Sequence, residues 1–245
     1  MPEILNLIGD DERPVVCETQ VAGDIWRTIE VAQKLGCIGS VVGEPGVGKT
    51  TAARAYAERV RRARYCVMDP VHDTMNAMLS LLCGAVCQWS PPCSTLELYE
   101  VLCNAVCDDR VKVLLVDEAQ HVNARNLDVL RGIHDKTGVP LVLLGNATLG
   151  SRFNTTRAAA FAQLSSRIGS KLYIKACPEA DLHAFARHYG AHEPKAITFL
   201  GKWAADKPGL RQAEMLLRLG RELACDGDIK LTHLKQAASI IGETR

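Results

Sequence analysis

The sequence lacks long hydrophobic segments, an excess of charge of either sign, internal repeats and low-complexity stretches. No apolar run approaches the roughly 20 residues that cross a membrane, and the mixed, acidic residues 1–12 do not resemble a signal peptide. We therefore expect a cytoplasmic protein with no membrane partner. The 29 basic and 28 acidic residues nearly balance, which excludes binding to nucleic acid through a large net positive charge.

Cysteine, by contrast, is abundant, with ten residues. Without an export signal, these residues are expected to be free thiols in a reducing cytosol. The pairs Cys83/Cys87 and Cys103/Cys107 have the i,i+4 spacing that places both thiols on one helix face, so zinc binding is one interpretation. We favour the other, small hydrophobic residues buried in apolar helices, because zinc sites more often use C-x2-C spacing.

The order of hydrophobic patterns predicts an α/β fold. Buried strands are expected at 37–42, 65–68, 111–116, 139–144 and 172–174. Helices are expected between them, at 18–35, 50–62, 75–86, 94–107, 126–137 and 157–166. Strands that are apolar on both faces and alternate with helices indicate a five-stranded parallel sheet sandwiched by helices.

Only helical patterns follow the last predicted strand, at 179–189, 194–205, 209–225 and 232–241. They predict a small all-helical lid. We expect an N-terminal arm over residues 1–17, an α/β core over 18–176 and the lid over 177–245.

Residues 43–50 read G-x4-G-K-T between a predicted strand and a predicted helix, which is the context that a phosphate-binding loop requires. Backbone N–H groups of such a loop converge on phosphate oxygens, and the helix N-terminus adds partial positive charge. Lys49 is expected on the β- and γ-phosphates of ATP and the Thr50 hydroxyl on Mg²⁺. The expected nucleotide-binding residues are Gly43, Glu44, Pro45, Gly46, Val47, Gly48, Lys49, Thr50 and Thr51.

Asp117 and Glu118 follow the apolar strand 113–116. Carboxylates at the tip of a buried strand are costly unless they have a role. We expect Asp117 to hold Mg²⁺ through water and Glu118 to polarise the attacking water. The alternative is a helix N-cap, with Asp117 as the cap and Glu118 in the first turn.

This order of motifs resembles that of AAA+ ATPases. The predicted strand 139–144 ends at Asn146, which resembles sensor 1, although a simple turn would also suit asparagine. The segment 165–169, Ser-Ser-Arg-Ile-Gly, is similar to the one that carries the arginine finger, here Arg167, which could otherwise be a surface cation. Arg211 resembles sensor 2; it could instead be a solvated residue in a first helical turn, where a cation opposes the helix dipole.

Three segments resemble the phage Mu B transposition protein and its relatives, the target-selecting ATPases of Tn7-like and IS21-like elements. They are Asp-Glu-Ala-Gln at 117–120, the segment 134–146 and the segment 161–169, within a resemblance that spans roughly 20–240. It implies a phage or mobile-element ATPase that forms a homo-oligomeric ring or filament on double-stranded DNA and engages a transposase. The alternatives are a helicase loader or replication initiator, and an ATP-gated scaffold without useful turnover.

The expected DNA contacts lie in the core, because only about 17 residues precede the first core helix where Mu B has a helix-turn-helix region. Candidates that flank the sensor 1 strand are Lys136, Arg152 and Arg157. A basic cluster at Arg59, Arg61, Arg62 and Arg64 could also contact phosphates, but we favour cations at the C-terminal end of the phosphate-loop helix.

Overall fold

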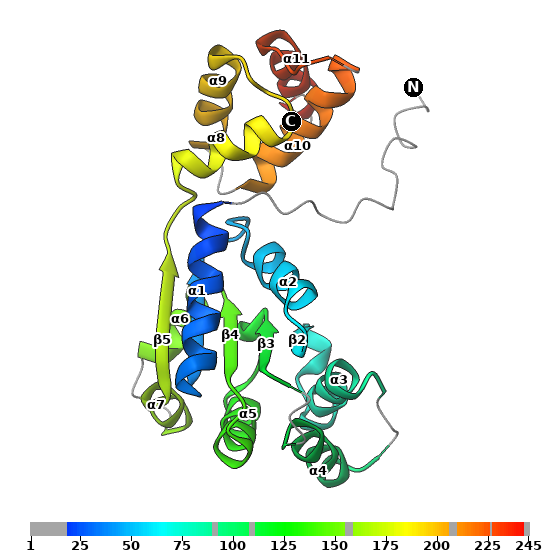
Figure 1. The fold of residues 1–245 in the computed structure, drawn as a ribbon, viewed down its shortest axis with the longest axis vertical. Coiled ribbons are helices and arrows are strands. Elements are labelled where there is room, and N and C mark those ends of the chain that lie inside the picture. Colours follow the sequence, from blue (N-terminus) through cyan, green and yellow to red (C-terminus); the bar gives the residue numbers. More distant parts are fainter. Residues whose placement is uncertain are drawn as a thin grey trace.

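A five-stranded parallel sheet forms the centre of the core in the computed structural model (Figure 1). The structure describes residues 19–89, 93–107, 111–154, 159–205, 210–225 and 227–242, so the predicted arm 1–17 lies outside it. The strands are β1 (Ile38–Gly43), β2 (Ala63–Val67), β3 (Val113–Asp117), β4 (Leu141–Gly145) and β5 (Ile168–Ile174). Their order is β2-β3-β4-β1-β5, and β1 lies between β4 and β5.

Helices cover both faces of this sheet. On one face lie α1 (Gln20–Leu35) and α2 (Lys49–Arg59); on the other lie α3 (Met75–Cys87), α4 (Thr95–Ala105), α5 (Ala124–Thr137), α6 (Ala147–Asn154) and α7 (Ala159–Ser166). Two short 3-10 turns span Pro70–His72 and Ala119–His121. Along β3, Val113 and Leu115 pack toward α1 and α2 while Leu114 and Val116 face the opposite layer. The predicted sandwich is confirmed.

The lid consists of α8 (Glu179–His188), α9 (Pro194–Ala205), α10 (Leu210–Ala224) and α11 (Leu231–Gly242). It has its own hydrophobic core and lies beyond the carboxyl ends of the strands (Figure 1). The division proposed at residue 176 falls between β5 and α8. No helix in the described part of the chain is long and apolar enough to cross a membrane.

A buried aspartate fixes the lid to the core. Asp181, on α8, is 2% exposed, and its two carboxylate oxygens accept hydrogen bonds from the backbone N–H groups of Gln20 (2.6 Å) and Val21 (2.9 Å). It therefore binds N–H groups at the start of α1 that lack partners within the helix. A second contact joins α10 to the phosphate loop, because the Leu210 N–H donates to the Gly46 carbonyl oxygen (2.8 Å).

We expect Asp181→Ala to lower the free energy of unfolding by about 1–3 kcal/mol, because two buried N–H groups lose their acceptor. For a chain of this size the melting temperature should fall by roughly 2–4 °C per kcal/mol. Differential scanning calorimetry measures this loss. The matched control is Asp24→Ala, since Asp24 is a partly exposed aspartate on α1 whose side chain pairs with Arg27 one turn away. Equal melting temperatures for both variants would contradict the account.

The structure corrects three element predictions. Strand β5 begins at Ile168 rather than 172, because an edge strand can hold Gly169, Ser170 and Lys171 through backbone pairing with β1 alone. Helix α6, which was not predicted, begins after Asn146. Helix α2 ends at Arg59 rather than 62.

Candidate nucleotide-binding site

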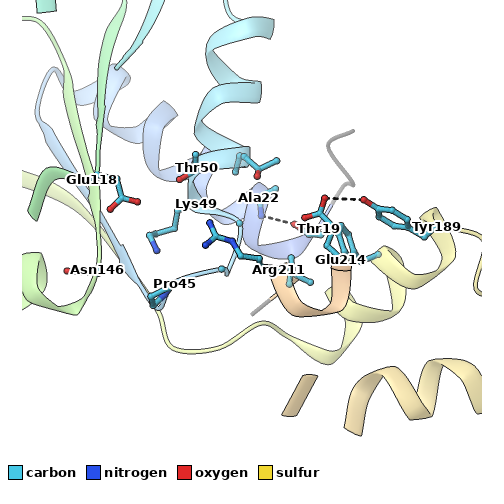
Figure 2. Close-up of a pocket in the computed structure, with 16 residues that line it drawn as sticks. Thr19, Ala22, Pro45, Lys49, Thr50, Glu118, Asn146, Tyr189, Arg211 and Glu214 are labelled. Atoms are coloured by element: carbon cyan, nitrogen blue, oxygen red, sulfur yellow. Dashed lines mark hydrogen bonds between the residues drawn. The ribbon is translucent and has the colours of Figure 1, made fainter. Parts of the chain in front are cut away.

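A cavity of about 350 Å³ opens between the carboxyl ends of the strands and the lid. The phosphate loop and the first turn of α2 form its floor, and Glu118, Asn146 and Arg211 line it from three further segments (Figure 2). The sequence predicted each of these residues for the site. Parallel sheets commonly place their ligands at this edge.

The phosphate loop needs glycine at specific points. Gly46 and Gly48 have φ values of 81° and 95°, a region that residues with a side chain rarely adopt. A Cβ at Gly43 would lie 2.9 Å from both the Cβ and the carbonyl oxygen of Ile174 on β5. These glycines therefore let the loop turn sharply beside β5 and deliver the N-terminus of α2 to the cavity.

Lys49 is the first residue of α2, and its side chain reaches back to the start of the loop. It is 9% exposed, and its Nζ donates to the carbonyl oxygens of Gly43 and Glu44, both at 2.9 Å. Desolvation lowers the pKa of Lys49, while the nearby carboxylates of Asp117 and Glu118 oppose that shift. A phosphate anion at this point would add a further interaction that favours the charged ammonium.

Asp117 lies behind the cavity wall rather than on it. It is fully buried; its Oδ1 accepts from the Glu118 N–H (2.8 Å) and its Oδ2 from the Tyr65 hydroxyl (2.9 Å). Burial, followed by the charge of Asp117, raises the pKa of Tyr65, so its hydroxyl remains a proton donor. The helix-cap alternative is wrong for Asp117, because its carboxylate binds the adjacent N–H and a tyrosine on β2.

Glu118 and Asn146 occupy the tips of neighbouring strands. Glu118 lines the cavity from a left-handed backbone conformation, φ 53°, which is costly for a residue with a side chain. Asn146 also lines the cavity, while its Oδ1 accepts from the Thr148 N–H (2.9 Å) and caps α6. Asn146 thus begins a helix rather than forming only a turn, and the sensor role stays a prediction.

Arg211 enters from the lid. It lies in the first turn of α10 and lines the cavity, and Figure 2 shows its side chain directed toward Lys49 and the phosphate loop. Two cations and the N-terminus of α2 thus converge at one end of the cavity. That combination favours a polyanion such as a triphosphate.

Comparison with known proteins shows the family to which the chain belongs. A family model described as AAA domain matches residues 34–153, and one described as Mu B transposition protein, C terminal, matches 166–240. The ATP-dependent target DNA activator B of Escherichia phage Mu is 31% identical over 210 residues, which cover 85% of this chain and 67% of the phage protein. The chain belongs to the Mu B transposition protein family.

Two further Mu B relatives and one solved structure extend this assignment. The activator B of Escherichia phage D108 is 30% identical over 85% of this chain and 67% of its own length. The Mu-like prophage FluMu DNA transposition protein B of Haemophilus influenzae is 27% identical over 73% of this chain and 63% of its own length. A Walker-type ATPase of Pyrococcus abyssi superposes with a TM-score of 0.64 at 14% identity, covering 97% of this chain and 77% of the archaeal one, which shows the fold alone. The core is thus an AAA ATPase domain, and the transposition resemblance is confirmed over the helicase-loader alternative.

Arg167 of this Mu B family member lies far from the cavity. Its carbonyl accepts from the Ile38 N–H (3.1 Å) at the start of β1, whereas the phosphate loop follows the end of β1. The strand between them spans about 17 Å. The Arg167 side chain instead pairs with Asp135 on α5 (Nε to Oδ1, 2.5 Å). Within one subunit Arg167 cannot reach the nucleotide, so a finger role requires a second subunit.

The predicted DNA contacts do not form one patch. Lys136, in the last turn of α5, lies at the amino end of β4 with its Nζ 5.0 Å from the centre of the Tyr99 ring. Arg152 lies beyond the carboxyl end of β4 and donates to the carbonyl oxygens of Gln120 (2.8 Å) and Val122 (3.0 Å). Arg157 lies outside the described residues. A DNA role for each of them stays a prediction.

The arginines of the basic cluster lie in different elements. Arg59 is in the last turn of α2, and its guanidinium lies over the Trp26 ring at 4.8 Å. Arg62 has a positive φ in the following turn, and Arg64 lies in β2. The explanation by the helix dipole therefore fits Arg59, the basic residue in the last turn of α2. Arg61, Arg62 and Arg64 follow the end of that helix.

Cys83 and Cys87 lie on α3, Cys103 lies on α4, and Cys107 follows the end of α4. Cys83 and Cys103 are buried in the core, as the hydrophobic interpretation predicts, while Cys107 is exposed. Burial raises the pKa of the Cys83 thiol to about 11, which disfavours the thiolate that zinc binds. Among the described residues, no group of three or more His, Cys, Asp or Glu side chains has a metal-binding arrangement.

Sequence reasoning missed one wall of the cavity and two polar neighbours. The wall comes from the start of α1 and from the lid: Thr19, Ala22, Phe185, Tyr189, Leu210 and Glu214. The neighbours are Tyr65, on Asp117, and Gln120, whose side-chain amide donates to the Glu118 carboxylate. No local pattern could place the wall, because its residues are far apart in sequence. Gln120, in contrast, lies within the Asp-Glu-Ala-Gln motif.

Proposed function

We propose that this chain is a Mg²⁺-dependent ATPase of the Mu B type that assembles on target DNA as a homo-oligomer and engages a transposase. The observation that supports it most is the convergence of Lys49, Arg211, Glu118 and the N-terminus of α2 on one cavity between core and lid. This geometry suits a nucleoside triphosphate, with its phosphates on the loop and its base toward the wall from α1 and α8.

Each polar residue of the cavity has a proposed role. Lys49 and Arg211 neutralise phosphate charge, and the Thr50 hydroxyl would hold Mg²⁺ together with Asp117, which acts through water because it lies behind the cavity wall. Bound Mg²⁺ would offset charge on the β- and γ-phosphates. Glu118 accepts a hydrogen bond from the attacking water and increases its nucleophilicity. Asn146 offers a polar group beside the same phosphate.

The position of Arg167 supports a shared active site. Because Arg167 is separated from its own phosphate loop by the length of β1, we propose that it contacts the γ-phosphate of a neighbouring subunit in a ring or filament. In the isolated subunit its side chain is paired with Asp135. The hydrogen bond from Arg167 is the main reason that the pKa of the Asp135 carboxyl group lies below its usual value.

Mixing two inactive variants tests this arrangement. Arg167→Ala and Lys49→Ala should each lack ATP hydrolysis, and a mixture should regain part of it, because some interfaces pair an intact finger with an intact loop. Asp135→Ala is the matched control, since it removes the same ion pair and keeps the arginine, so it should hydrolyse ATP. A phosphate-release assay across mixing ratios measures the rescue. No rescue, in mixed oligomers shown to form by crosslinking, would contradict a finger that acts between subunits.

The proposed DNA partner rests on family membership and on charge. The phage Mu relative is named an ATP-dependent target DNA activator. With a formal net charge of +1, one subunit of this chain offers few surplus cations, so each should neutralise few phosphates and useful affinity should come from repeated subunits. Lys136, Arg152 and Arg157 remain the proposed contacts.

Electron microscopy tests the assembly directly. With a non-hydrolysable ATP analogue and duplex DNA we expect rings or filaments along the DNA, and with ADP or no nucleotide we expect dispersed particles. Assemblies that form equally without nucleotide would contradict the proposal. Measuring turnover with and without DNA in the same samples separates an ATPase from a scaffold that only binds ATP.

A further inference from the structure

The side chain of Gln120 joins the tips of two neighbouring strands. Its Nε2 donates to the Glu118 carboxylate beyond β3, and its Oε1 accepts from the Asn146 N–H (3.3 Å) beyond β4. One amide group therefore connects the proposed water-polarising carboxylate to the strand end that carries the proposed sensor. None of the roles derived above uses this connection.

The chemistry of the bridge requires a glutamine amide. Its NH₂ group supplies the donor that a carboxylate needs, and its carbonyl supplies the acceptor that a backbone N–H needs. Glutamate at 120 would keep the shape but would lose the donor and place like charges together. The neighbouring strand is shaped for this contact, since a Cβ at Gly145 would lie 2.7 Å from the Gln120 Oε1.

The backbone of the same turn is held from α6. Arg152 donates from one nitrogen to the carbonyl oxygens of Gln120 (2.8 Å) and Val122 (3.0 Å). Asn146, whose N–H donates to the Gln120 side chain, also caps α6, because its Oδ1 accepts from the Thr148 N–H. Both the side chain and the backbone of Gln120 therefore depend on the position of α6.

We propose that Gln120 is a positioning residue that orients the Glu118 carboxylate toward the attacking water and makes that orientation depend on α6. The inference rests on the proposed role of Glu118. Glu118 already has a left-handed backbone, so its side chain leaves the strand at an unusual angle and gains a fixed direction from the amide. Because α6 packs against α7, which directly precedes Arg167, a shift at the proposed subunit interface would reach Glu118 through α7, α6 and Gln120.

Gln120→Ala should lower kcat for ATP by roughly 10- to 100-fold, because a small misplacement of a catalytic group has effects of that size. Affinity for a fluorescent ATP analogue should stay within about threefold, because Gln120 is not among the residues that line the cavity. Gln120→Glu should lose at least as much activity. Gln236→Ala, on the exposed face of α11, is the control and should match the unmodified protein.

A double variant separates positioning from general damage. If Gln120 acts through Glu118, then Glu118→Gln and Glu118→Gln/Gln120→Ala should share one residual rate, because the second change has nothing left to misplace. A further tenfold loss in the double variant, with a lower melting temperature, would show a merely structural role and overturn the proposal.

Nuclear magnetic resonance of the nucleotide-free protein gives a readout that is independent of activity. The amide cross-peak of Asn146 should shift in Gln120→Ala and stay in place in Gln236→Ala. An unchanged Asn146 cross-peak would overturn the bridge. So would turnover in Gln120→Ala equal to that of the unmodified protein while Glu118→Gln is inactive, and that result would leave the role of Glu118 intact. If Glu118→Gln turned over ATP as fast as the unmodified protein, the proposed function of that carboxylate would be overturned instead.

Discussion

Replacing Glu118 with glutamine is expected to reduce ATP hydrolysis by on the order of 10²-fold or more while ATP still binds. The substitution keeps the size and hydrogen-bonding reach of the side chain but removes the negative charge that polarises water. Glu118 lines the cavity but, unlike Lys49 and Arg211, offers the phosphates no positive charge. Binding and chemistry should therefore separate at this one residue.

Single-turnover kinetics and titration with a fluorescent ATP analogue, on the same preparation, measure the two effects. Glu58→Gln is a suitable control, because Glu58 is exposed on α2 outside the cavity. Turnover within a few-fold of the unmodified protein in Glu118→Gln would assign the base to another residue. Loss of binding together with turnover would mean that Glu118 shapes the site rather than activating water.

Lys49→Ala is expected to weaken ATP binding by on the order of 10²-fold and to abolish turnover, because hydrogen bonds to charged groups contribute about 1.5–3 kcal/mol each. The ammonium is buried within the loop, held by two loop carbonyl groups, so no other cation can replace it from solvent.

Isothermal titration calorimetry with ATP measures this loss. Lys34→Ala, at the exposed end of α1, removes the same charge away from the site and should bind normally. Circular dichroism of both variants checks that the fold is kept. Normal affinity in Lys49→Ala would remove the phosphate-loop assignment.

Hydrophobic patterning predicted most of the fold. Strands β1, β3 and β4 are buried along their whole length, and all three were predicted within two residues at each end. In β3 and β4 the residues 113–116 and 141–144 form continuous apolar runs. Edge strand β5 was predicted too short, because its first half alternates and depends on pairing with β1. Helix α6 was missed because it is only eight residues long and includes a glycine and a serine, which favour turns.

The phosphate end of the candidate site could be predicted and its other parts could not. Lys49 and its loop form one contiguous motif, and Glu118 follows a strand that parallel-sheet geometry places at the same edge. The wall that includes Tyr189 and Glu214 is assembled only when the lid folds back, a contact between segments more than 130 residues apart. The Tyr65 bond to Asp117 likewise depends on strand order, which no local pattern reveals.

Fluorescence anisotropy on two unrelated duplexes, with ATP, ADP or no nucleotide across a salt series, tests the central claim most directly. The account predicts a cooperative isotherm with ATP on both duplexes, little binding in the other two states, and a steep loss of affinity as salt rises. Binding that ignores the nucleotide, or no binding with ATP at low salt, would contradict it.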